Sequence, residues 1–182
     1  MFQLSLVDHI RLSFGSIVSA YEGHTEAAAR LARWSWHAKL AILAVLGSAA
    51  GTSIAAAIRG GIYTVVAAAL SAAAFAACAA FVAIDPETRV YGHRTTAARL
   101  WLMCEKYRAL LAEIHDQLID VPTMAQRRDA LLKEVSELLE QAPPADRATY
   151  DIARKALGGV YSEQQVDQFL PLSLRRPTSA TT

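Results

Sequence analysis

The sequence predicts an all-α protein in which a two-helix transmembrane hairpin is flanked by long N- and C-terminal cytoplasmic amphipathic helices. Three observations support this fold class. Hydrophobic residues make up 53% of the chain and the mean hydropathy is +0.22, which is high for a soluble protein. The excess is concentrated in two uncharged runs, residues 40–58 and 60–84, with Arg59 alone between them. On either side of these runs, apolar residues recur at helical spacing.

Residues 1–36 are predicted to form an amphipathic cytoplasmic helix that ends at the membrane surface. Its apolar and small residues are spaced alternately three and four positions apart, which places them on one stripe of a helix. The stripe consists of Val7, Ile10, Phe14, Ile17, Tyr21, His24, Ala28 and Leu31. Such a face requires a partner to cover it.

The end of this helix has the composition of a segment that passes through lipid headgroups. Trp34 and Trp36 alternate with polar and basic residues, and Lys39 immediately precedes the first uncharged run. Tryptophan is enriched at both membrane surfaces. We therefore predict that Trp34, Trp36 and Lys39 are interfacial anchors. The alternative is a pair of core tryptophans in a soluble helical bundle.

Residues 37–85 are predicted to be the transmembrane hairpin, with a first span at about 39–58 and a second at about 61–84. The first run has 19 uncharged residues, about 28 Å of helix, against a hydrocarbon core of about 30 Å. The second has 25 and can span with some tilt. The Arg59-Gly60-Gly61 link is too short for a folded loop and has the glycines of a helix reversal.

Insertion of these runs is favourable by a small margin, because both are rich in alanine. Only seven residues of the first and eight of the second are Leu, Ile, Val or Phe, which contributes on the order of −3 kcal/mol to each span. A buried, alanine-rich hairpin in a soluble protein therefore stays open as an alternative.

Basic residues are distributed unequally around the hairpin. They are Arg11, Arg30, Arg33 and Lys39 before it, and Arg89, Arg94, Arg99, Lys106 and Arg108 after it. The turn has Arg59 alone. The positive-inside rule then predicts that both termini are cytoplasmic.

Asp85-Pro86 is predicted to cap and begin a long cytoplasmic helix over residues 86–121. Its apolar stripe consists of His93, Ala97, Leu100, Cys104, Tyr107, Leu111, Ile114, Leu118 and Val121. This stripe can pair with the N-terminal one in an antiparallel manner, or both can pack between subunits. Residues 122–174 are predicted to be a C-terminal helical extension, with Thr123 and Gln126 as a capping box, and residues 175–182 a disordered tail.

The sequence has no pattern typical of an enzyme, a metal site or a cofactor site. The five histidines are scattered without ligand spacing, and Cys78 and Cys104 fit no CxxC motif. No glycine-rich phosphate loop is present. The net charge of +1, without a basic cluster, argues against nucleic acid as a partner. We expect no catalytic residue, metal or cofactor, and the lipid bilayer as the first partner.

The informative residues lie inside the spans. Gly47 and Gly51 form a GxxxG motif, with Ser48 and Thr52 beside it, and Ser71 adds a hydroxyl to the second span. Small residues allow close approach of helix backbones in lipid. We predict that these five residues pack helices or line a pore. The glycines would equally suit closure of the hairpin within one chain.

Three local patterns occur in order around the hairpin: SLVDHIRLSFG at residues 5–15, HTEAAARLARW at 24–34 and YGHRTTAARLW at 91–101. Together with the glycine-broken first span and the minimal turn, this layout resembles the SLATT domains, two-TM effector domains associated with SMODS and SLOG proteins. The resemblance covers roughly residues 5–120, and its local features include His24 and the His93-Arg94 pair.

The resemblance implies an effector of a bacterial conflict system that oligomerises in the inner membrane and permeabilises it, as in antiviral defence by abortive infection. The signal would come from a separate sensor protein of the same operon, typically a nucleotide-second-messenger system, because this chain shows no fused nucleotidyltransferase, SLOG or TIR domain. One alternative function is a membrane-anchored adaptor whose cytoplasmic helices recruit a partner without forming a pore. A soluble helical scaffold is a third.

Overall fold

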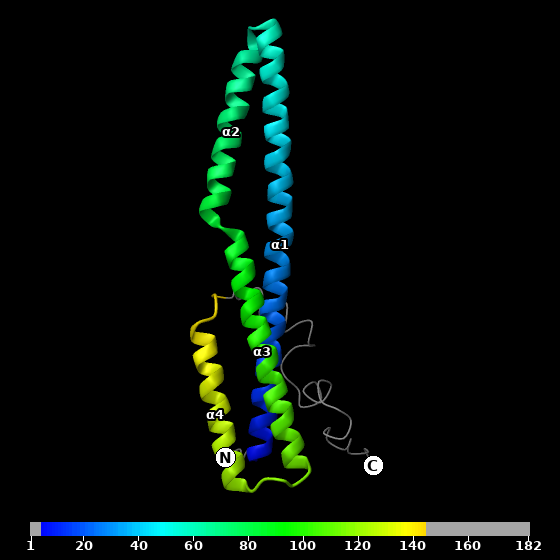
Figure 1. Ribbon diagram of the computed structural model, residues 1–182, viewed down its shortest axis with the longest axis vertical. Helices are drawn as coiled ribbons and strands as arrows, with labels where there is room; N and C mark the ends of the chain where they lie inside the picture. The colour runs from blue at the N-terminus through cyan, green and yellow to red at the C-terminus, as the bar shows by residue number, and fades with distance from the viewer. Residues whose placement is uncertain (1–4, 145–182) are drawn as a thin grey trace, which may run out of the picture. The chain divides into compact units, whose positions relative to one another are not determined.

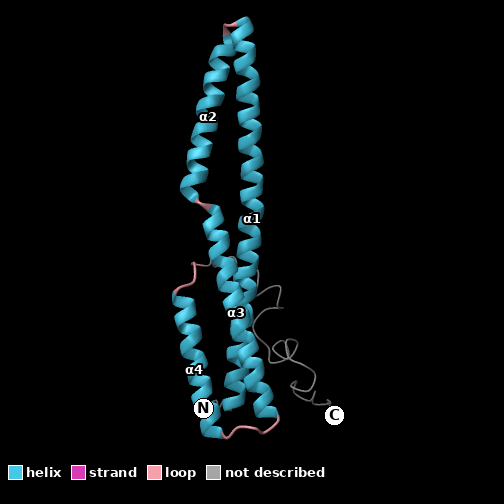
Figure 2. Ribbon diagram, in the orientation of Figure 1, coloured by secondary structure: helices cyan, strands magenta, loops and turns pink. Residues whose placement is uncertain are grey.

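The computed structural model describes residues 5–144, which form four helices (Figure 1). In chain order these are α1 (Leu6–Arg59), α2 (Ile62–Ile84), α3 (Pro86–His115) and α4 (Val121–Glu140). The described part of the chain contains no strand (Figure 2), and the predicted all-α fold is confirmed. The rest of the predicted C-terminal extension, beyond residue 144, and the predicted tail at 175–182 lie outside the described residues.

Helix α1 combines the predicted N-terminal helix and the first span. It runs without a break through Gly15 and Gly23 and on through the tryptophan-rich segment. Its start is stabilised by the Ser5 hydroxyl, which accepts a hydrogen bond from the Asp8 amide at 3.1 Å, as expected of an N-cap. The predicted boundary between residues 36 and 37 is therefore not a break in secondary structure.

The chain divides into two compact units. We call the first the bundle; of the residues that the structure describes, it comprises 5–27 and 92–144. We call the second the hairpin; it comprises Ala28–Tyr91. Each is described by itself below.

The bundle has a core where the first part of α1 meets α3 and α4. The core side chains are Ile10, Phe14, Ile17, Val18, Ala20, Leu100, Met103, Cys104, Tyr107, Leu110, Leu111, Met124 and Val135. Ile10, Phe14, Leu100 and Tyr107 have no exposed surface. The two stripes predicted before and after the uncharged runs thus pair within one chain, and burying such side chains contributes about 1.5–3 kcal/mol each.

Helix α3 ends at His115, earlier than the predicted end at 121. Gln117 adopts a left-handed conformation, with φ of 56°. The amides of Gln117 and Leu118 donate back to the carbonyls of Ile114 and Glu113, at 3.1 and 2.9 Å, which is the hydrogen-bond pattern of a Schellman motif. Leu118 and Val121, predicted on the apolar stripe, are therefore 70% and 67% exposed.

Helix α4 begins after Asp120, and the predicted capping box at Thr123 and Gln126 is wrong. The Asp120 carboxylate accepts a hydrogen bond from the Thr123 amide at 3.2 Å, so Asp120 is the N-cap. Pro122 lies in the first turn, where its missing amide hydrogen costs nothing. Hydrogen bonds from the Thr123 hydroxyl and amide lower the pKa of Asp120.

The hairpin turn is as predicted. Gly60 and Gly61 have φ angles of +63° and +61°, which side chains rarely tolerate, and α2 begins at the next residue. At the far end of α2, Asp85 has φ of 44°, and its carboxylate accepts from the Thr88 amide at 3.4 Å. The predicted cap at Asp85, with Pro86 at the start of the next helix, is confirmed.

Candidate functional site

The hairpin exposes its large apolar side chains. The most apolar 18-residue stretch of α1 is only 6% buried, and that of α2 with α3 only 11%. Leu43, Ile54, Ile58, Phe75 and Val82 are between 62% and 77% exposed. A soluble protein rarely leaves so large an apolar surface in water. Both helices are long and apolar enough to cross a membrane, and the exposed surface is suited to contact with lipid.

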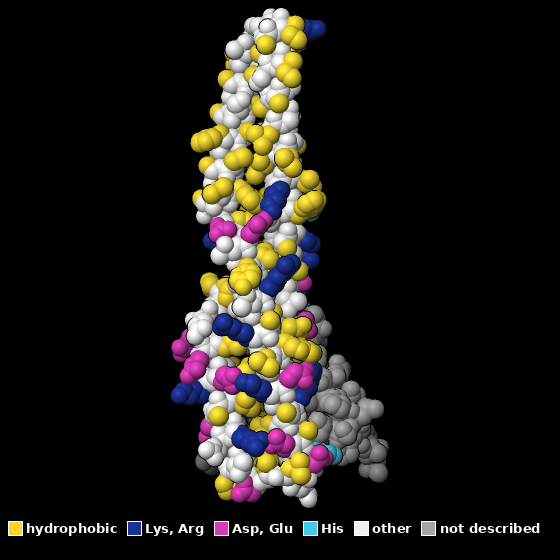
Figure 3. All heavy atoms as spheres, in the orientation of Figure 1, with side chains coloured by type: hydrophobic (Ala, Val, Ile, Leu, Met, Phe, Trp, Pro, Cys, Tyr) yellow, Lys and Arg dark blue, Asp and Glu magenta, His cyan; other side chains and the backbone are white. Residues whose placement is uncertain are grey.

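Charged side chains bound the apolar surface of the hairpin at its two ends. Figure 3 shows none along its length, with a basic side chain at the turn and charged groups again at the opposite end. At that end Lys39 of α1 forms an ion pair with Glu87. Trp34 is 46% exposed and stacks on Phe81 of α2, with ring centroids 6.4 Å apart, while Trp36 is 61% exposed. The three predicted anchors therefore lie together at one end of the hairpin.

Alanines are the buried residues where the middle parts of α1 and α2 meet in the hairpin. Ala49 of α1 and Ala67 and Ala74 of α2 are buried, with at most 8% exposure. Alanine side chains allow two helices to pack closely.

The GxxxG glycines do not take part in this contact. Residues two positions apart on a helix point about 200° apart, so Gly47 and Gly51 lie opposite Ala49. Both glycines are exposed, and a Cβ atom added to either would meet nothing within 4 Å. The glycine face of α1 is therefore not what closes the hairpin within one chain.

Ser48 and Thr52 lie one turn apart on α1, and Ser71 lies on α2. Ser48 is exposed beside the glycines, Thr52 is half-buried on the side of the helix contact, and Ser71 is exposed on α2. The Ser48 hydroxyl donates to the Ala44 carbonyl at 2.9 Å, and the Thr52 hydroxyl lies 2.9 and 3.0 Å from the Ser48 and Ala49 carbonyls. Ser48 and Thr52 are thus satisfied within their own helix.

A shallow cavity of about 270 Å³ lies between α3 and α4. Its lining includes Leu110 and Leu131. At its rim Glu113 forms an ion pair with Arg127, and Lys106 forms one with Glu134. Because these charged groups are already paired, the cavity offers a ligand mainly an apolar wall.

Within residues 5–144 no group of three or more His, Cys, Asp or Glu side chains is placed to hold a metal ion. Burial raises the pKa of the Cys104 thiol to about 11, so this cysteine stays protonated and is a poor nucleophile at neutral pH. Burial also raises the pKa of Tyr107 to about 12. Both groups belong to the core.

Sequence reasoning missed the polar pairs that join distant segments. Lys39 was predicted as an anchor without its partner Glu87, and His24 contacts His93 inside the bundle. A signal for the second pair was present, since each predicted stripe contained one histidine among apolar residues. The antiparallel register of the two stripes decides whether they meet.

Comparison with known families gives one match. The model of the SMODS and SLOG-associating 2TM effector domain family 4, SLATT_4, matches residues 6–168. Comparison with curated proteins and with solved structures finds no match. The family match extends well past residue 120, where the resemblance in the sequence was thought to end, so α4 is part of the family's domain. The chain therefore belongs to the SLATT family, as a two-TM effector domain of family 4.

Proposed function

We propose that this protein is the membrane-permeabilising effector of a bacterial antiviral defence system. In this proposal it lies in the inner membrane with both termini cytoplasmic. On a signal from a separate sensor protein of the same operon, copies assemble through the glycine face of α1 and open a path across the bilayer. Membership in a family of two-TM effector domains supports the class of function.

The open glycine face is the observation that supports assembly. A helix with glycine at an interior position is less stable than the same helix with alanine there, by roughly 0.5–1 kcal/mol. A Cβ atom added to Gly47 or Gly51 would meet no atom of the same chain within 4 Å, so packing within the chain does not require glycine at either position. The buried residues that face α2 are alanines. A close helix contact outside the chain would account for both glycines.

The chemistry of the hairpin suits an opening that is not selective for one charge. No charged side chain occurs in residues 40–58 or 60–84, so these segments contain no proton relay or charged selectivity ring. Polar groups available near the glycine face are hydroxyls such as Ser48, bonded to the Ala44 carbonyl. A rearranged assembly could exchange that bond for water.

Substitution at Gly51 tests the proposal. We expect Gly51→Leu to abolish toxicity and membrane depolarisation on overexpression in bacteria while the protein stays in the membrane fraction. The reason is that a leucine fits the single chain but blocks close approach of a second helix. The measurement is growth together with a membrane-potential dye.

The matched control is Ala57→Leu. Ala57 is also exposed on α1 but lies about 120° around the helix from Gly51, so this variant should stay toxic. Full toxicity of Gly51→Leu would contradict assembly through the glycine face. Membrane residence of the unsubstituted protein without depolarisation, even with its sensor present, would favour the adaptor function.

A further inference from the structure

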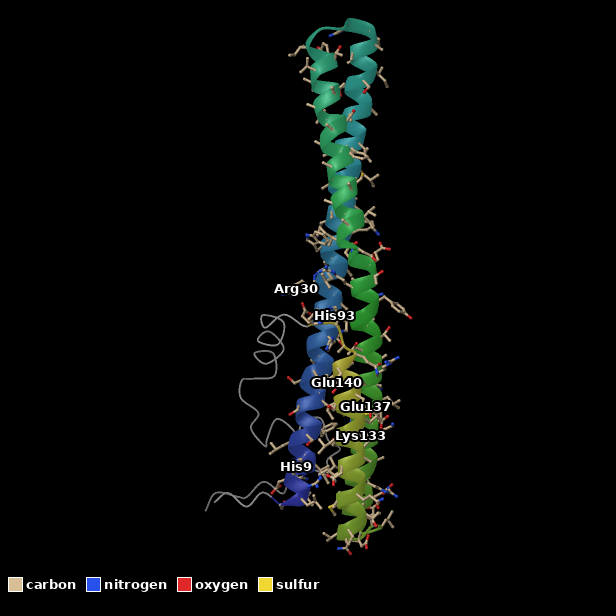
Figure 4. All side chains as sticks on the ribbon, turned by 90° about the vertical axis from the view of Figure 1, so that its left-hand side faces the viewer. His9, Arg30, His93, Lys133, Glu137 and Glu140 are labelled. Atoms are coloured by element: carbon tan, nitrogen blue, oxygen red, sulfur yellow. The ribbon has the colours of Figure 1, made fainter. Side chains whose placement is uncertain are left out.

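Two buried histidines contact each other across the bundle. His24 of α1 and His93 of α3 are 1% and 6% exposed, and His93 is labelled in Figure 4. Their Nδ1 atoms are 2.9 Å apart, and their ring centroids are 5.1 Å apart at an interplanar angle of 41°. The distance is that of a hydrogen bond between the two rings.

This contact fixes the protonation states that the pair can adopt. One Nδ1 must carry a hydrogen and the other must offer its lone pair, because a neutral imidazole has one donor and one acceptor nitrogen. When both rings are protonated, both Nδ1 atoms carry hydrogens. The hydrogen bond is then lost, and two positive charges face each other in a buried site.

Among the described residues, the surroundings of His24 offer little compensation for a positive charge on its ring. One turn away, the neighbours are Ala20, Tyr21, Ala27 and Ala28 on α1, and Arg89, Val90, Thr96 and Ala97 on α3. The charged residues that follow or precede the pair most closely along these helices are Glu22, Glu26 and Arg30 on α1 and Arg89 and Arg94 on α3, and Glu137 and Glu140 lie near the end of α4. Burial, and next the charge of His93, lower the pKa of His24. No carboxylate among the described residues acts on His24 strongly enough to offset these effects.

The two histidines lie in the helices that are continuous with, or directly follow, the two spans. His24 lies in the same continuous helix as the first span, and His93 lies in the helix that directly follows α2. A change in how α1 and α3 pack at this level therefore acts on the helices that lead into both spans.

We propose that the His24–His93 pair is a proton-operated latch, which holds α1 and α3 together at neutral pH and releases them when acidification protonates both rings. The latch is a property of the bundle, while its use as a trigger of permeabilisation rests on the proposed function. A histidine with a lowered pKa stabilises the fold above its unfolded pKa of about 6.5. That contribution is lost as the pH falls below this value.

Hydrogen exchange of the full-length protein in detergent micelles tests the latch. Protection of segments 17–31 and 90–104 is measured at about pH 7.5 and about pH 5.5, corrected for the intrinsic pH dependence of exchange, with a chelator present. We expect protection in both segments to fall about tenfold or more at the lower pH. The double variant His24→Gln/His93→Gln, which cannot titrate, should lose this response.

The control is the triple variant His9→Gln/His37→Gln/His115→Gln. These three histidines are exposed, so this variant should respond to pH as the unsubstituted protein does. If the double variant does not fold, the single variant His24→Gln replaces it in the measurement, because one histidine cannot form a doubly charged pair. Protection that does not change with pH, or an unchanged response in the pair variants, would overturn the latch. A response that requires added Zn²⁺ and disappears with the chelator would also overturn it, in favour of a metal site.

Dye release from liposomes containing the same protein separates the latch from the proposed function. Release with pH-independent exchange would overturn the latch alone. A pH response in exchange, without release at any pH, would keep the latch and count against permeabilisation.

Discussion

Single side chains determine which of the regularly spaced apolar residues belong to the bundle core. Leu100 and Tyr107 are completely buried, whereas Leu118 is 70% exposed although it continues the same spacing. The difference is due to Gln117, whose left-handed conformation ends α3. A stripe in the sequence thus predicts the face of a helix well but not the residue at which the helix stops.

Two neighbouring leucines of α3 test the assignment of that face. Leu100→Ala should lower the free energy of unfolding of the bundle by about 2–5 kcal/mol, because it removes a fully buried side chain and leaves a cavity. Leu102 is 54% exposed, so Leu102→Ala should change the free energy of unfolding by no more than about 0.5 kcal/mol. Denaturant unfolding of the protein in micelles measures both. Equal losses in the two variants would contradict the packing of α3.

The contact between His24 and His93 could not be predicted from the sequence. His24 and His93 could each be placed on a stripe from local spacing. Their contact depends on the register between two helices that are far apart in sequence, and that register is set by the sum of many core contacts. For the same reason Lys39 could be predicted at the membrane surface without its partner Glu87.

At the level of helices, the sequence predicted the turn and the breaks where local chemistry dictates them. Gly60 and Gly61 supply the positive φ angles of the reversal, and Asp85 with Pro86 ends one helix and begins the next. Which faces of α1 and α2 meet was not predictable, because alanines surround both spans. The structure places Ala49 at the contact and the glycines opposite it.

Adjacent alanines of α2 test this choice of faces. Ala74 is 1% exposed, and Ala74→Leu should destabilise the hairpin by about 1–3 kcal/mol through overpacking. Ala73 is exposed, so Ala73→Leu should have little effect. Resistance of the detergent-solubilised protein to unfolding by a denaturing detergent provides the comparison. A larger effect at Ala73 would indicate that another face of α2 contacts α1.

For the whole molecule, the fold and the function rest on different kinds of observation. Composition and periodicity predict a two-span helical protein, and the exposed apolar hairpin supports it. The class of function comes from the family, whose model matches residues 6–168. The glycine face and the histidine pair are where the structure adds specific hypotheses to that assignment.

We propose that the protein resides in the membrane and acts there. Cell fractionation after expression in bacteria, combined with a membrane-potential dye in the same cells, tests it most directly. We expect recovery in the membrane fraction, extraction only by detergent, and depolarisation that Gly51→Leu removes. Recovery of the folded protein in the cytosol without detergent, with the membrane potential unchanged, would contradict it.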